Sequence, residues 1–90
     1  MTRAEVYESS VAKGAAFLDK EADFNWRDQI DVTTLDLGVA DRCILGQLYG
    51  DYSDGVWSLG IENADELGFS TEFSYRVLTR YWKEELSRSA

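Results

Sequence analysis

The sequence contains no histidine and no proline, and these two absences exclude different things. Histidine is the commonest general base and a frequent metal ligand, so Ser-His-Asp and Cys-His catalytic sites cannot form within this chain. Proline removes a backbone donor and breaks helices, so no proline interrupts a helix anywhere in the 90 residues. The chain is therefore free to be helical throughout, and the most familiar hydrolytic sites are excluded.

Cysteine and long apolar runs are also scarce. The single cysteine, Cys43, excludes an internal disulfide and fits a reducing compartment. Its place on a predicted helix beside Ile44 is typical of a small buried hydrophobe rather than of a nucleophile. No apolar stretch approaches the roughly 18 residues of a membrane span, and the stretch MTRAEVYESS lacks the apolar core of a signal peptide. We expect a cytoplasmic protein without a membrane association.

Basic residues are few and unevenly distributed. Nine lysines and arginines stand against 17 acids, which gives a net charge of −8. Residues 19–72 hold 13 acids and three bases, whereas residues 73–90 hold four bases and two acids. A nucleic-acid-binding surface is normally basic because it neutralises phosphates, so direct nucleic-acid binding is not expected. A protein partner with a basic surface fits this charge, as does the simpler interpretation that acidity keeps a small domain soluble.

The chain does contain enough apolar material for a packed core. Hydrophobic residues make up 44% of the sequence and aromatic residues 13%. A chain of this size forms one domain and buries somewhat over about 60% of its unfolded surface. We therefore expect a single helical domain over residues 1–90, with Trp26 and Trp82 in its core.

Helical periodicity marks both ends of the chain. Residues 3–19 place apolar side chains at helical spacing, and Thr2 and Glu5 have the spacing of a capping box. Gly14 weakens this helix by about 1 kcal/mol relative to alanine, and it leaves room for another backbone. Residues 71–87 carry a wide apolar stripe, with bases toward the end that suit the negative pole of a helix. The candidate caps of this last helix are Ser70 and Thr71.

The most apolar candidate helix lies between these two, over residues 40–49. Asp41 can cap its start, Gly50 stands at its end, and its broad apolar face predicts a central position. Shorter turns each end in a Leu-Gly pair, namely Leu37-Gly38, Leu59-Gly60 and Leu67-Gly68. Ser53 or Asp54 can cap the second of these. The predicted fold is all-α: a small single domain with longer N- and C-terminal helices packed on a central apolar helix, plus several short helices.

Residues 51–62, DYSDGVWSLGIE, have the length of an EF-hand calcium loop. Such a loop needs side-chain oxygens at positions 1, 3, 5 and 12 and a glycine at position 6. Three positions fit, namely Asp51, Ser53 and Glu62. The fifth residue, Gly55, has no side-chain oxygen, and the sixth, Val56, resists the bend that glycine supplies. The sequence therefore predicts helix punctuation here and no calcium site.

Close pairs of carboxylates occur twice. Asp51 with Asp54, and Asp28 with Asp31, lie three residues apart and can share a helix face. Pairs of this kind serve acid–base chemistry or hold Mg²⁺. A chain with 17 acids produces them by chance, and no Walker loop or dinucleotide fingerprint accompanies them. We assign no catalytic, cofactor-binding or metal-binding residue, and we keep a small carboxylate- or metal-dependent enzyme as an alternative.

Aromatic side chains bracket an acidic turn in the middle of the chain. The candidate interaction patch comprises Tyr49, Asp51, Tyr52, Asp54 and Trp57. Aromatic residues beside charges are typical of protein-binding surfaces. The alternative is that the three aromatic side chains bury against the first and last helices.

Several short elements follow one another in a fixed order. They are Lys13-Gly14, Leu18-Asp19, Trp26, Ile30-Asp31, the run from Cys43 to Leu48, Gly68-Phe69 and Trp82. This order, over residues 13–82, resembles a set of small proteins encoded by phages and prophages of actinobacteria. Where those proteins place Pro-Gly before the first tryptophan, this chain has Phe24-Asn25. The set has no assigned activity, so the resemblance implies no catalytic residue.

The resemblance implies a context, the cytoplasm of a bacterium during infection or lysogeny. The expected function is that of a non-enzymatic phage or prophage accessory protein that binds a host or phage protein. An acidic decoy that occupies a nucleic-acid-binding surface is a further alternative beside the small enzyme. The sequence leaves a homodimer open and names no partner.

Overall fold

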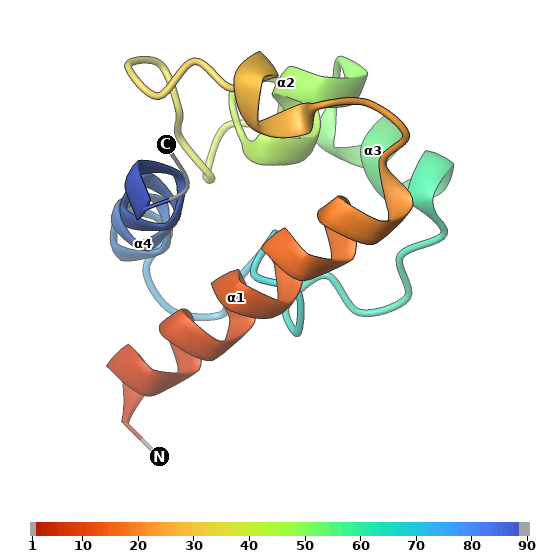
Figure 1. Ribbon diagram of the computed structural model, residues 1–90. Coiled ribbons are helices and arrows are strands. Elements are labelled where there is room, and N and C mark those ends of the chain that lie inside the picture. Colours follow the sequence, from red (N-terminus) through yellow and green to blue (C-terminus); the bar gives the residue numbers. More distant parts are fainter. Residues whose placement is uncertain (1, 89–90) are drawn as a thin grey trace.

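The N-terminal helix α1 (Arg3–Glu21) is the longest element of the computed structural model, which describes residues 2–88 (Figure 1). It begins at the predicted capping box. The Thr2 hydroxyl accepts a hydrogen bond from the Glu5 amide at 3.2 Å, and the Glu5 carboxylate accepts one from the Thr2 amide at 3.3 Å. The helix expected over residues 3–19 is confirmed and continues to Glu21. Its buried face comprises Tyr7, Val11, Gly14, Ala15 and Leu18.

The remaining helices are one 3₁₀ turn, two short α-helices and a longer last helix. They are η1 (Trp26–Gln29), α2 (Ile44–Tyr49), α3 (Tyr52–Leu59) and α4 (Tyr75–Arg88). Helix α1 packs on α4, and α2 packs on both α3 and η1. Residues 2–88 contain no strand, so the all-α prediction, with longer helices near both ends, is confirmed.

A single hydrophobic core joins these helices. Trp82 is 0% exposed and Trp26 is 2% exposed, which confirms the two predicted core tryptophans. Trp82 stacks on Phe69 with 5.6 Å between ring centroids and meets Trp26 edge-on at 6.3 Å. Its indole nitrogen donates a hydrogen bond to the Gly68 carbonyl at 2.6 Å, so the buried polar atom is satisfied. Ile44 and Leu45 of α2 are fully buried as well, while the two terminal helices pack chiefly on each other.

The expected close approach at Gly14 is confirmed. An ideal Cβ at this position would overlap the Leu67 carbonyl oxygen and lie 3.0 Å from the Trp82 ring. Leu67 belongs to a turn that Asn63 caps, because the Asn63 side chain accepts a hydrogen bond from the Glu66 amide at 3.1 Å. Helix α1 therefore meets the 63–69 segment backbone to backbone, which seats that segment on the core.

The predicted start of the central helix at residue 40 is wrong. Helix α2 begins at Ile44, and its cap is Cys43 rather than Asp41, because the Cys43 sulfur accepts the Gly46 amide at 3.2 Å. The backbone before it forms tight turns, in which the Val39 carbonyl accepts the amides of Arg42 and Cys43. Those turns use the residues that a longer helix would need.

The predicted start of the last helix is also wrong. Helix α4 begins at Tyr75, and the Ser74 hydroxyl accepts the Val77 amide at 3.2 Å in the manner of a cap. Neither expected cap acts there. The Ser70 hydroxyl donates to Asp65, and the Thr71 hydroxyl accepts from the Phe73 amide at 3.1 Å in a separate turn.

Candidate interaction surface

The stretch that resembles a calcium loop is largely helical. Asp51 adopts an extended backbone, and its carboxylate accepts a hydrogen bond from the Ser53 amide at 3.1 Å, so it caps α3. The expected cap at Ser53 or Asp54 is therefore wrong. The expected stop at Gly60 is confirmed, because Gly60 is left-handed with φ 65° and follows Leu59.

This conformation gives the candidate calcium ligands other roles. The Asp51 carboxylate holds a helix cap, and Ser53 lies in the first turn of α3. Gly55 is buried against α2, where an ideal Cβ would lie 2.7 Å from Leu45 Cβ. Residues 2–88 contain no group of three or more acidic or cysteine side chains that could hold a metal ion.

Trp57 is the most exposed large hydrophobic side chain among residues 2–88, with 87% of its surface accessible. The alternative that all three aromatics of the patch bury against the terminal helices is thus wrong for Trp57. Helix α3 packs on α2 through the side that carries Gly55, and this packing turns Trp57 outward. Asp54, one turn earlier, is exposed as well.

The two tyrosines of the patch have different surroundings. Tyr49 is partly buried, and its ring meets Phe24 edge-on at 6.2 Å. Burial, helped by the negative charge of Asp23, raises the pKa of Tyr49 above its usual range. Tyr52 lines an open hollow of about 250 Å³ together with Leu37 and Tyr75.

The structure therefore divides the five predicted patch residues. Asp54 and Trp57 share the exposed face of α3, Asp51 is its cap, and the two tyrosines pack against other segments. We call the exposed set Ser53, Asp54, Trp57 and Ser58 the α3 face. In the sequence, a tryptophan set among small and acidic residues marks this stretch, but its exposure depends on which side of α3 packs on α2.

The other predicted carboxylate pair serves local structure. Asp28 accepts a hydrogen bond from the Asn25 side chain at 2.8 Å. Asp31 accepts the Thr33 hydroxyl at 2.6 Å and the Thr33 amide at 3.0 Å, and these bonds hold the pKa of Asp31 below its usual range. Asp28 thus stabilises the start of η1, and Asp31 stabilises the turn that follows it.

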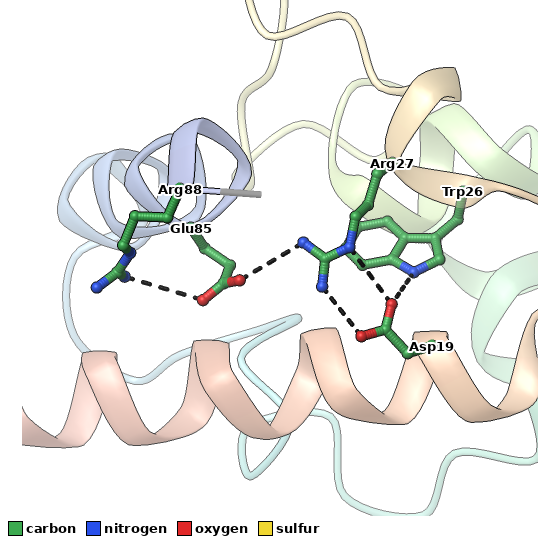
Figure 2. Close-up of polar contacts among 5 residues, drawn as sticks. All are labelled: Asp19, Trp26, Arg27, Glu85 and Arg88. Carbon is green, nitrogen blue, oxygen red and sulfur yellow. Dashed lines mark hydrogen bonds and ion pairs between the residues drawn. The ribbon is translucent and has the colours of Figure 1, made fainter. Parts of the chain in front are cut away.

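A charged network that sequence reasoning missed joins α1, η1 and α4 (Figure 2). The Arg27 guanidinium lies 3.1 Å from Asp19 and 3.5 Å from Glu85, and it stacks 4.6 Å from the centroid of the Trp26 ring. Asp19 also accepts the Trp26 indole N–H at 2.9 Å. Hydrogen bonds from Arg27 and then from Trp26 hold the pKa of Asp19 below its usual range. Arg88 adds an ion pair with Glu85 at 3.8 Å.

The single thiol is buried, as its sequence setting indicated. Cys43 is 1% exposed, and burial raises the pKa of its thiol, which lowers the thiolate population at neutral pH. Its sulfur also donates to the Ala40 carbonyl at 3.6 Å. Cys43 is therefore a packing and capping residue rather than a reactive one.

The elements that carry the resemblance hold this fold together. Asp19 binds the Trp26 indole, and the Gln47 side chain accepts from the Asp31 amide at 2.6 Å and donates to the Asp31 carbonyl at 3.1 Å. Trp82 lies at the centre of the core. These residues therefore have structural roles, and a binding function would depend on exposed side chains instead.

Comparison of the chain with known protein families, curated proteins and solved structures found no match. None of the helices within residues 2–88 has the length and apolar character needed to cross a membrane.

Proposed function

We propose that this chain is a non-enzymatic binding protein that contacts another protein through the α3 face. The observation that carries the proposal is Trp57, whose side chain is 87% exposed on a short helix. A fully hydrated indole is unfavourable in isolation, whereas the same indole buried in a partner removes about 150–250 Å² of surface from water. Tryptophan is also among the residues most enriched in binding hot spots.

The support around Trp57 is rigid, which favours binding. Asp51 caps α3 at one end, Gly60 ends it at the other, and Gly55 holds it against Leu45 of α2. A side chain on a fixed helix loses less conformational freedom on binding than one on a loop.

The charges around this face define the partner. Asp54 and Glu62 are exposed, and the chain carries a net charge of −8. The partner is therefore a protein with an apolar slot for the indole and a basic rim, since complementary charges speed encounter and exclude wrong partners.

The resemblance to phage and prophage proteins of actinobacteria suggests the setting. We place the chain in the bacterial cytoplasm as an accessory protein that acts on a host or phage protein. A homodimer and the two alternative functions, an acidic decoy and a small enzyme, predict different results in the experiment below.

The experiment is affinity capture from an actinobacterial lysate with the tagged chain and two variants. Trp57→Ala removes the proposed anchor, and Phe24→Ala removes another exposed aromatic residue, 40% accessible, as the matched control. One partner, named by mass spectrometry, should bind the wild type and Phe24→Ala alike. Its affinity should fall about thirtyfold or more with Trp57→Ala, since removing a hot spot typically costs about 2 kcal/mol or more.

Three other outcomes would contradict the proposal. Capture that Trp57→Ala leaves unchanged, but that high salt abolishes, indicates the acidic decoy. A metal-dependent activity that survives purification without any captured partner indicates the enzyme. Capture of an untagged copy of the chain, added to the lysate, and of no other protein indicates a homodimer.

A further inference from the structure

A row of three basic side chains runs along one face of α4. Arg76, Arg80 and Lys83 lie four and three residues apart, and all three are exposed. None of them forms an ion pair within residues 2–88. Although the chain has 17 acids, these three neighbouring cations have no carboxylate partner within residues 2–88.

Two open hollows adjoin this row. One, of about 420 Å³, is lined by all three bases together with Leu35, Asp36 and Thr79. The other, of about 610 Å³, lies between the end of α4 and the segment after η1, and its lining includes Lys83, Val32 and Leu86. Lys83 borders both hollows, which therefore adjoin, and we call the pair the α4 groove.

The α4 groove offers apolar contact as well as charge. Val32 is 43% exposed, and Leu86 is partly buried beside it. A chain that laid an apolar side chain on these two residues would cover surface that water now touches.

Two aspartates, Asp36 and Asp28, also line the groove, and each accepts a local hydrogen bond. Asp36 accepts the Gly38 amide at 2.9 Å, and Asp28 accepts the Asn25 side chain at 2.8 Å. Arg27, at the lower end, is held by Asp19 and Glu85 (Figure 2). The carboxylates of Asp28 and Asp36 stay charged, because their donors are neutral, so the three bases of the α4 row give the groove a positive excess over these two acids.

We infer that the α4 groove binds an acidic segment of another protein, with carboxylates on the α4 row and an apolar side chain on Val32 and Leu86. The net charge of −8 does not prevent this binding, because the molecule measures 32 × 29 × 23 Å and charges are screened over about 8 Å at physiological salt. A nucleic acid fits less well, since its phosphates need a longer basic track and make no use of an apolar floor.

This surface is separate from the α3 face. Figure 1 shows α3 and α4 at opposite sides of the molecule. The two faces carry opposite charge, so they select opposite partners, and a variant of one leaves the other intact.

The test is selection of a random peptide library displayed on phage against the immobilised chain. A triple variant, Arg76→Glu with Arg80→Glu and Lys83→Glu, serves for counter-selection. A second triple variant, Arg3→Glu with Lys13→Glu and Lys20→Glu, makes the same change in net charge at residues of α1 that do not line the groove. Far-ultraviolet circular dichroism verifies that both are folded.

The expected result is a pool enriched in Asp and Glu together with Leu, Phe or Trp. The dissociation constant of the selected peptides, measured by fluorescence anisotropy, should rise at least tenfold on the α4 variant and stay within twofold on the control. Val32→Asp alone should also weaken the binding of the selected peptides, since it places a carboxylate on the apolar part of the groove.

Four outcomes would overturn the inference. A neutral or basic pool, or no selected peptide, shows that the groove does not take acidic segments. Equal binding to the α4 variant places the peptides elsewhere. Tighter binding of a single-stranded DNA oligonucleotide assigns the row to phosphates. Concentration-dependent association in sedimentation, lost in the α4 variant, assigns the groove to a second copy of this chain.

Discussion

At the residue scale, two tryptophans of this chain differ in their exposure to solvent. Trp82 is 0% exposed at the centre of the core, whereas Trp57 is 87% exposed on α3. The first stacks on Phe69 and donates to the Gly68 carbonyl, so truncating it leaves a large cavity and an unpaired carbonyl. The second touches mostly water.

Trp82→Ala should therefore destabilise the fold by roughly 3–5 kcal/mol, which is enough to unfold a domain this small. Trp57→Ala should change the free energy of unfolding by less than about 0.5 kcal/mol. Urea denaturation followed by circular dichroism measures both. Equal losses in the two variants would show that Trp57 is buried in solution.

The Asp19 carboxylate makes stability depend on pH. Its pKa is lowered in the folded protein by Arg27 and then by Trp26, so its contribution is fully present above the unfolded pKa of about 3.9 and is lost as pH falls through the folded value. Asp19→Asn should lower the melting temperature at pH 7. The difference from wild type should shrink as pH falls below about 4.

Asp41→Asn is the control for this pH dependence. Asp41 is exposed and has no hydrogen bond or ion pair within residues 2–88, so the same loss of charge should leave the melting temperature nearly unchanged. Equal melting temperatures of wild type and Asp19→Asn at every pH from 7 to 2 would show that the contacts of Asp19 in Figure 2 add nothing to stability.

At the scale of the element, a helix terminus was predicted correctly where its signal lies in the neighbouring residues. The capping box at Thr2 and the stop at Gly60 are confirmed because each depends only on residues beside it. The start of α2 depends on more distant bonds, among them the Asp36 amide to the Arg42 carbonyl at 3.2 Å. Cysteine is a weak acceptor, so nothing in the sequence marked Cys43 as the cap.

Gly14 makes a packing prediction for α1. Gly14→Ala should destabilise by roughly 1–3 kcal/mol, because its Cβ would overlap the Leu67 carbonyl and force α1 away from the 63–69 segment. Helix propensity alone predicts the opposite sign, a gain of about 1 kcal/mol.

Ala12→Gly calibrates that propensity at an exposed position of the same helix. It should cost about 1 kcal/mol. The contrary result is a rise in melting temperature for Gly14→Ala that equals the fall for Ala12→Gly. That result would show that the close contact between Gly14 and Leu67 is absent.

Helix α3 makes a prediction about calcium. Millimolar calcium should leave the melting temperature unchanged, because Asp51 is engaged as a cap and Gly55 and Val56 cannot supply the missing ligand and bend. A bound ion would stabilise the folded state by RT ln(1 + [L]/Kd). A rise of several degrees in the melting temperature with calcium, lost in Asp51→Ala, would show that a calcium site exists. Magnesium at the same concentration is the control for ionic strength.

At the scale of the whole molecule, fold class was easier to predict than the surface. Helical periodicity and the absence of proline favoured an all-α fold, and the core tryptophans followed from their apolar settings. The exposure of Trp57 did not follow, because it depends on which side of α3 packs on α2. The α4 groove was beyond sequence reasoning too, since Val32 and Leu86 meet only through the tertiary fold.

The uneven charge predicts a dependence on salt. Raising sodium chloride from about 0.01 M to about 1 M shortens the screening length from about 30 Å to about 3 Å. The melting temperature should rise, because self-repulsion in a chain of net charge −8 weakens more than the few ion pairs do.

The matched variant combines Glu8→Lys with Glu62→Lys; both side chains are exposed and neither forms a hydrogen bond or ion pair within residues 2–88. Each change adds two charges, so the net charge rises from −8 to −4. The increase with salt should be smaller in this variant. A fall with salt in the wild type would mean that the Arg27 ion pairs outweigh the repulsion.

The contrast among the three tryptophans also makes the chain its own fluorescent reporter. Trp26 and Trp82 are shielded from solvent, so a water-soluble quencher such as acrylamide reaches only Trp57. The quenchable, red-shifted part of the emission therefore monitors the α3 face alone. A partner that covers this face would shift that component to shorter wavelength and protect it from the quencher, without any label attached to the protein.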